Sequence, residues 1–169
     1  MRGRVFVVGG HSRGVGKTAL VVDLVRSLGS HGRRVATVKV SAHRHGAAVV
    51  VEEDTTPSLF TSTGRCLAAG ASRAFLCRCP DEHLAAACAL VHDLRATGAD
   101  VVVESNRMGA RLDPDLTFFV VSAGTTDWKP SSAACLARAD AIVLGPGTDQ
   151  APPRVWPYLE PGGRAELLA

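Results

Sequence analysis

A glycine-rich segment near the amino end of the chain carries the residue types that bind phosphate. It reads Gly9-Gly10-His11-Ser12-Arg13-Gly14-Val15-Gly16-Lys17-Thr18 and separates an apolar run, Val5 to Val8, from a helix-forming run that begins at Ala19. Glycines let backbone N–H groups surround a phosphate, and the amino end of a helix adds positive potential. We therefore expect the segment from Ser12 to Ala19 to hold a phosphate chain. Lys17 would reach the terminal phosphates, and the Thr18 hydroxyl would ligate Mg²⁺.

The segment departs at one position from the strict Walker A pattern, G-x-x-x-x-G-K-[ST]. That pattern has glycine where this chain has His11. The Gly-x-Gly-Lys-Thr ending is rare by chance, and it follows a predicted strand and opens a predicted helix, which is the context that supports the motif. We interpret the segment as a phosphate loop, with a glycine-rich turn that binds nothing as the alternative.

Two acidic residues are candidates to complete a magnesium site. Glu104 ends the apolar run Val101 to Val103 and should emerge at the same sheet edge as the phosphate loop, where it would act as a metal-holding and catalytic acid. Its alternative is a solvated carboxylate at a strand end. Asp54 precedes a predicted helix and is a candidate to hold the metal and to orient an attacking water. Its alternative is an ordinary helix cap, because acids often occupy that position.

Lysine is scarce in this chain, which has sixteen arginines and only Lys17, Lys39 and Lys129. Where arginine dominates, a retained lysine suggests a task for a compact ammonium group. Lys39 should end a strand beside the phosphate loop and reach phosphates or an anionic substrate. Lys129 should lie at a similar edge, and its neighbour Trp128 is a candidate to stack on a base or on a substrate ring.

Two further pairs of residues have spacing that can bind a metal. His43 and His45 form one pair, and Cys77 and Cys79 form the other. On extended backbone, residues two apart face the same side, so either pair can supply two ligands. No convincing set of four ligands follows from the spacing. Solvated histidines and buried strand thiols are the simpler interpretation.

Short apolar runs alternate with segments of helical period along most of the chain. The predicted strands are Val5 to Val8, Arg34 to Val40, Ala74 to Cys77, Val101 to Val103, Phe118 to Val121 and Ala141 to Leu144, and the predicted helices are Gly16 to Leu28, Pro57 to Ala69, Asp81 to Thr97 and Ser131 to Ala139. Uniformly apolar strands are typical of a parallel sheet that is covered on both faces. We predict an α/β fold, a three-layer sandwich with a mostly parallel sheet of the P-loop NTPase type. Residues 41–56 and 106–115 show no clear element.

Length and composition restrict the classes of protein to which the chain can belong. Its 169 residues suit a single nucleotide-binding domain over residues 1–169, with a proline-rich and peripheral tail over residues 145–169. The net charge of +3 comes from basic and acidic residues spread along the chain, which argues against nucleic acid as a partner. No apolar run approaches a membrane span or a signal peptide, so we expect a cytoplasmic protein.

Several of these features together resemble the MobB proteins of molybdopterin-guanine dinucleotide biosynthesis, in the SIMIBI group of P-loop NTPases. The resemblance covers roughly the first 110 residues. It rests on the motifs Gly14 to Thr18, Gly32 to His43, Asp54 before a helix that ends Ala68-Ala69-Gly70-Ala71, and Val103-Glu104. The family usually has glycine after Val-Glu, whereas this chain continues Ser105-Asn106-Arg107. The last third of the chain, including residues 126–130, does not match the family well.

The resemblance implies a function that the residues alone do not specify. It implies a homodimer that binds GTP with Mg²⁺, hydrolyses it slowly and assists a partner enzyme of molybdenum cofactor synthesis. The residues leave GTP and ATP open as the nucleotide. Two alternatives remain: an ATP-dependent kinase or ligase that places Lys39 and Lys129 on a small acid, and a metallochaperone NTPase that uses His43 and His45.

Overall fold

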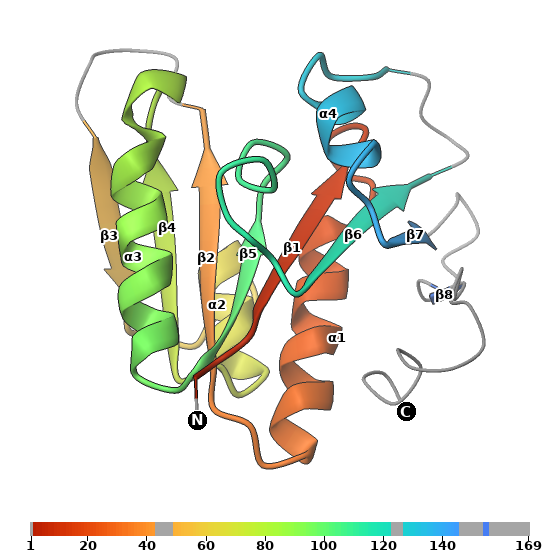
Figure 1. Cartoon of the computed structure of the whole chain (residues 1–169). Helices are drawn as coiled ribbons and strands as arrows, with labels where there is room; N and C mark the ends of the chain where they lie inside the picture. Colours follow the sequence, from red (N-terminus) through yellow and green to blue (C-terminus); the bar gives the residue numbers. More distant parts are fainter. Residues whose placement is uncertain (1, 43–48, 123–126, 146–153, 156–169) are drawn as a thin grey trace.

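The computed structural model describes residues 2–42, 49–122, 127–145 and 154–155. Its centre is an eight-stranded sheet with the strand order β3-β4-β2-β5-β1-β6-β7-β8 (Figure 1). In chain order the strands are β1 (Val5–Gly10), β2 (Val35–Ser41), β3 (Val50–Asp54), β4 (Arg73–Arg78), β5 (Asp100–Glu104), β6 (Leu116–Val121), β7 (Ala141–Leu144) and β8 (Arg154–Val155).

The six inner strands are parallel, and the two outermost strands are antiparallel to their neighbours. Thus β3 runs antiparallel to β4, and β8 runs antiparallel to β7. The carboxyl ends of β4, β2, β5, β1, β6 and β7 consequently lie along one edge of the sheet. In open α/β sheets this edge is where ligands bind. The predicted mostly parallel α/β sheet is confirmed.

Helices cover both faces of the sheet. One face packs against α1 (Lys17–Ser30) and α2 (Ser62–Ala68), and the other packs against α3 (Leu84–Ala96), which follows a single 3-10 turn, Asp81–His83. The short helix α4 (Ser132–Leu136) lies on the α3 face, because a Cβ built on Gly9 would meet the Cys135 sulfur at 2.2 Å. These layers are the predicted three-layer sandwich.

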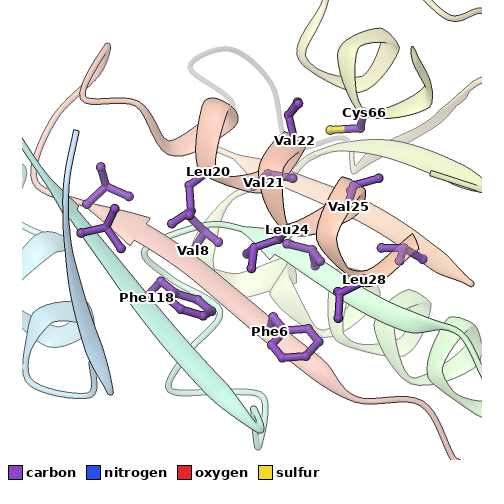
Figure 2. Packing of buried hydrophobic residues seen from close by; sticks show 14 of the residues in the cluster. Phe6, Val8, Leu20, Val21, Val22, Leu24, Val25, Leu28, Cys66 and Phe118 are labelled. Atoms are coloured by element: carbon purple, nitrogen blue, oxygen red, sulfur yellow. The ribbon is translucent and has the colours of Figure 1, made fainter. Parts of the chain in front are cut away.

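Side chains of β1 point alternately to the two faces of the sheet and so belong to two separate hydrophobic cores. Phe6 and Val8 point toward α1, whereas Val5 and Val7 point toward α3. Figure 2 shows the first core, in which the α1 side chains Leu20, Leu24 and Leu28 pack over the strands. Burying a side chain of this size contributes about 1.5–3 kcal/mol, so the helix is held firmly and its amino end is fixed at the carboxyl edge of β1.

At the opposite edge of the sheet, where the parallel strands begin, one buried carboxylate at the start of β5 binds two arginines. Asp100 is fully buried and accepts hydrogen bonds from the side chains of Arg4 and Arg33, at distances of 2.8–2.9 Å. Its pKa is lowered to about 2 because these hydrogen bonds outweigh the effect of burial, which raises the pKa and is the largest single contribution. The contacts join the starts of β1, β2 and β5, and β5 carries Glu104 at its other end.

The structure corrects the sequence interpretation at two places. Residues 41–56 were expected to lack an element, yet β3 forms at the sheet edge, with Glu52 paired to Arg78 and Glu53 to Arg73. Charged cross-strand pairs stabilise this exposed strand, so it lacks the apolar signal of a buried one. The second helix begins at Ser62 rather than Pro57, because Thr61 caps it by accepting from the Gly64 N–H at 2.9 Å.

Of the proline-rich tail, the structure describes only Gly145 and the two residues of β8. Within the described residues, no helix has the length and apolar character needed to cross a membrane.

Candidate functional site

A cleft of about 1230 Å³ runs along the carboxyl edge of the sheet. It spans the ends of five strands, from residues 80–81 after β4, through residues 39–42 at the end of β2 and 104–107 after β5, to the phosphate loop after β1 and residues 129–131 after β6. Of the predicted site residues, the cleft brings together Arg13, Gly14, Gly16, Lys17, Thr18, Ala19, Lys39 and Glu104. The sequence prediction therefore places most of its candidates on one surface.

The phosphate loop has the backbone shape that phosphate binding needs. Gly14 and Gly16 have φ values of 74° and 101°, in the left-handed region that favours glycine. Gly16 is the residue just before α1, and its carbonyl accepts from the Leu20 N–H at 3.0 Å. The backbone from Gly14 to Gly16 therefore turns sharply into the amino end of α1. Two other predicted loop residues, Ser12 and Val15, are buried and do not line the cleft.

Lys17 lies within this loop with its ammonium group directed at the carbonyl of Ser12, to which it donates a hydrogen bond. Burial lowers the pKa of Lys17 from 10.5 to about 8, with further lowering by Lys129 and Lys39, while Glu104 and Cys135 act in the opposite direction. A partly desolvated cation beside other cations is stabilised by an added anion. The environment of Lys17 is thus one in which a phosphate chain would supply the missing negative charge.

This environment predicts a pH dependence for binding of a nucleoside triphosphate. An ammonium with a depressed pKa is charged below about pH 8 and neutral above it, and only the charged form attracts phosphate. Bound phosphate raises the pKa of Lys17 by linkage, so affinity should fall by up to about tenfold per pH unit above pH 8. Calorimetric titration of Mg·ATP between about pH 7 and pH 9.5 checks this. The Lys17→Met variant should lose this dependence, and an equally steep fall in that variant would contradict the assignment.

Glu104 lies where a magnesium-holding acid is expected. Its side chain is 9% exposed and accepts a hydrogen bond from the Thr18 hydroxyl at 2.8 Å. The other carboxylate oxygen pairs with the Lys39 ammonium at 2.9 Å, and Lys39 also donates to the Ser62 hydroxyl at 2.8 Å. A hydroxyl and a carboxylate that touch one another beside a phosphate loop are the hard oxygen donors that Mg²⁺ prefers. These residues therefore fit a magnesium ion.

His11 occupies the position of the first Walker glycine. Its side chain is buried, and its ring lies against the Trp128 indole with centroids 5.0 Å apart, while Trp128 also stacks on Phe119 at 6.0 Å. The His11 carbonyl accepts from the Lys129 N–H and the Ser132 hydroxyl, both at 2.9 Å. The histidine thus joins the phosphate loop to residues 128–132. Trp128 packs against this histidine and is half exposed.

Asn106 is a positioning residue that the sequence interpretation did not select. Its carboxamide accepts from the Gly10 N–H at 2.7 Å and donates to the Gly10 carbonyl at 2.9 Å. The same amide lies 3.4 Å from the hydroxyls of Ser131 and Ser132. It fastens the start of the phosphate loop to the loop after β6. A signal was present in the sequence, since Ser105-Asn106-Arg107 replaces the expected glycine directly after the predicted acid.

We expect Asn106→Ala to destabilise both the fold and the nucleotide site. The Gly10 N–H is buried and would lose its partner, which costs about 1–3 kcal/mol in the free energy of unfolding. Urea unfolding measures this loss, and titration of a nucleoside triphosphate should show weaker binding because the loop is less well fixed. Asn106→Asp keeps the acceptor for Gly10 but loses the donor to the Gly10 carbonyl, so it should recover only part of the lost stability. Unchanged stability and affinity in Asn106→Ala would contradict the role.

The structure does not bring Asp54 to the phosphate loop. Asp54 ends the antiparallel strand β3 and lies opposite Ala74, near the start of β4 and away from its carboxyl end. Its carboxylate accepts from the Thr63 hydroxyl at 2.8 Å, the Thr56 N–H at 3.1 Å and the Thr61 hydroxyl at 3.3 Å. These hydrogen bonds lower the pKa of Asp54, led by the bond from Thr56. Here the carboxylate organises the turn into α2, and its proposed catalytic and metal roles have no support from this geometry.

Of the two candidate metal-binding pairs, the structure describes only the cysteine pair. Cys77 and Cys79 are buried, and burial raises the pKa of both thiols, to about 11 for Cys77. Within the described part of the chain, no group of three or more histidine, cysteine, aspartate or glutamate side chains is placed to hold a metal ion. His43 and His45 lie outside the described residues.

The fold of this chain is similar to that of a solved structure. No family model matches the chain, and no curated protein matches it. The chain is similar to the "apo" form of LpxK from Aquifex aeolicus, a structure in complex with ATP, with a TM-score of 0.50 and 20% identity. The match covers 86% of this chain and 49% of LpxK, so the chain spans about half the length of that protein. Together with the strand order and the phosphate loop, this likeness shows that the chain has the fold of a P-loop NTPase.

Proposed function

We propose that the protein binds a purine nucleoside triphosphate with Mg²⁺ and cleaves the bond to its terminal phosphate. The observation that carries the proposal is the contact between Thr18 and Glu104, 2.8 Å apart at the wall of the cleft that contains the phosphate loop. A phosphate loop alone explains anion binding. A hydroxyl and a carboxylate placed together beside it explain a magnesium site as well.

Each residue of the site has a defined task in this proposal. The N–H groups around Gly14 and Gly16 surround the phosphates, and Lys17 neutralises charge that shifts to the leaving oxygen. Thr18 and Glu104 hold the metal ion. When bound, Mg²⁺ neutralises phosphate charge and aligns the terminal phosphate. Lys39, which is paired with Glu104, keeps that carboxylate in place and adds a positive charge beside the terminal phosphate.

The finer parts of the proposal rest on the sequence resemblance. The MobB-like motifs support GTP as the nucleotide, slow hydrolysis, a homodimer and an accessory role in molybdenum cofactor synthesis in the cytoplasm. The LpxK structure is in complex with ATP, which supports a purine nucleoside triphosphate as the ligand. This likeness favours ATP, whereas the sequence motifs favour GTP. Asp54 is engaged in its own turn, so a water-orienting group for hydrolysis has to be sought elsewhere in this site.

A second candidate function is phosphoryl transfer to a small molecule. It is favoured by the size of the cleft, about 1230 Å³, and by the cations that line it beyond the phosphate loop, including Arg65 and Arg107. A site that only hydrolyses a nucleotide does not need the part of the cleft that extends beyond the phosphate loop. Transfer and hydrolysis use the same phosphate loop and the same magnesium site.

Calorimetric titration tests the proposal with GTP and ATP, each with and without Mg²⁺. We expect binding of at least one nucleotide, tightened by Mg²⁺ in the wild type. Affinity that does not respond to Mg²⁺ would refute the metal site, and absence of binding by both nucleotides would refute the proposed function. The ratio of the two affinities decides between GTP and ATP.

A further inference from the structure

The cleft extends well beyond the phosphate loop. The contact between Thr18 and Glu104 lies at the end of β5, where these residues would hold the metal end of a nucleotide, and the cleft continues from there toward β2 and β4. That continuation is lined by residues 40–42 at the end of β2 and by residues 80–81 after β4. Pockets for a single small ligand usually hold roughly 300–1,000 Å³. At about 1230 Å³, this cleft has room for a second ligand on the far side of the terminal phosphate.

Two guanidinium groups line this far part, which we call the acceptor arm and define by Ser41, Arg65, Asp81 and Arg107. Its one carboxylate, Asp81, pairs with Arg107 at 2.5 Å and is largely exposed to solvent. Lys39, at the border with the phosphate loop, is already paired with Glu104. The acceptor arm therefore retains an excess positive charge. Anions are attracted to a concave surface of this kind, because its protein walls weaken solvent screening.

The two arginines differ in how they are held. Arg107 donates to the Cys79 carbonyl at 3.1 and 3.2 Å in addition to its pair with Asp81, so its guanidinium is fixed in the wall of the cleft. The Arg65 guanidinium, on α2, forms no hydrogen bond or ion pair with any residue that the structure describes; only the Arg65 backbone is bonded, within the helix. A guanidinium offers five donors in a fork that matches the oxygens of a phosphate or carboxylate. Arg65 is thus the group in this arm whose donors are available.

We propose that the acceptor arm binds the phosphate or carboxylate group of a small hydroxyl-bearing molecule, with Arg65 as its main partner, and that this molecule accepts the terminal phosphate. This inference rests on the proposed function. In the transfer, the hydroxyl oxygen bonds to the terminal phosphorus while the bond from that phosphorus to the bridging oxygen breaks. The nucleoside diphosphate leaves with the bonding electrons, and the hydroxyl proton passes to water.

The test separates the acceptor arm from the phosphate loop by filling the loop first. Protein saturated with Mg²⁺ and the β,γ-imido analogue of the preferred triphosphate is titrated with inorganic phosphate and, separately, with succinate. We expect one of these anions to bind the loaded wild type and to bind Arg65→Gln about tenfold more weakly, because a charge-assisted hydrogen-bonded pair is lost. Arg26→Gln is the matched control, since Arg26 lies exposed on α1 and pairs only with Asp23 among the described residues.

The outcomes are distinct. Binding of phosphate but not succinate, or the reverse, identifies the anionic group. No binding of either anion to the loaded wild type, or equal binding by Arg65→Gln, overturns the inference while leaving the nucleotide site intact. If the analogue itself fails to bind, the proposed function fails. The same titrations on unloaded protein then decide the acceptor arm alone: binding that depends on Arg65 supports it, and binding that does not overturns it.

Discussion

Replacing Lys17 with alanine is expected to weaken nucleotide binding about 100-fold, equivalent to about 2.8 kcal/mol. The Lys17 ammonium is the cation that the phosphate loop directs toward the phosphates, and burial has stripped part of its hydration, so a bound phosphate chain compensates it strongly. Loss of the same ammonium should change stability little, because the Lys17 side chain makes one hydrogen bond within the described part of the chain, to the Ser12 carbonyl, and its removal relieves a desolvated charge.

Calorimetric titration of GTP and ATP with Mg²⁺ measures this effect, and thermal unfolding confirms that the variant is folded. Arg26→Ala is a matched control, because it removes a cation from the exposed face of the same helix without touching the cleft. Undiminished affinity of Lys17→Ala for both nucleotides would refute the phosphate-loop assignment. A collapse of the fold would instead show that the lysine acts as a structural residue.

Glu104→Gln is expected to abolish the tightening of nucleotide binding by Mg²⁺ and to slow phosphate release about 100-fold or more. The amide keeps the shape of the side chain and still accepts from Thr18, but it removes the charge that holds a divalent ion. It also leaves Lys39 without its carboxylate partner at 2.9 Å. Lys39 is partly exposed to water, so this second effect on stability should be small.

The magnesium dependence distinguishes a metal ligand from a residue that only holds Lys39. Affinity is titrated at several Mg²⁺ concentrations for Glu104→Gln and for Asp81→Asn, which removes one carboxylate from the same cleft at a largely exposed position. Only Glu104→Gln should lose the dependence on Mg²⁺. An unchanged dependence in that variant, or an equal loss in both, would contradict the assignment of Glu104.

Much of the site could be predicted because its parts are local in the chain. The phosphate loop is one continuous segment, and Glu104 directly follows an apolar strand, so strand topology alone brings them to one edge. The position of Asp54 could not be predicted in this way, for a physical reason. Its strand is antiparallel, and a reversed strand ends at the opposite edge from its parallel neighbours. Charged edge strands of this kind lack the apolar pattern that reveals direction and length.

The phosphate loop, the acid at the end of β5 and the layered parallel sheet could be predicted from the amino-acid sequence, because each depends on local spacing and on apolar runs. The surroundings of these features depend on how the chain folds. The tertiary structure placed His11 between the loop and Trp128, fastened Gly10 through Asn106 and brought Arg65 and Arg107 into one cleft. These contacts join residues far apart in the chain, and no local pattern specifies which strand ends become neighbours. The order of the strands in the sheet decides that, and here it determines which cations line the cleft.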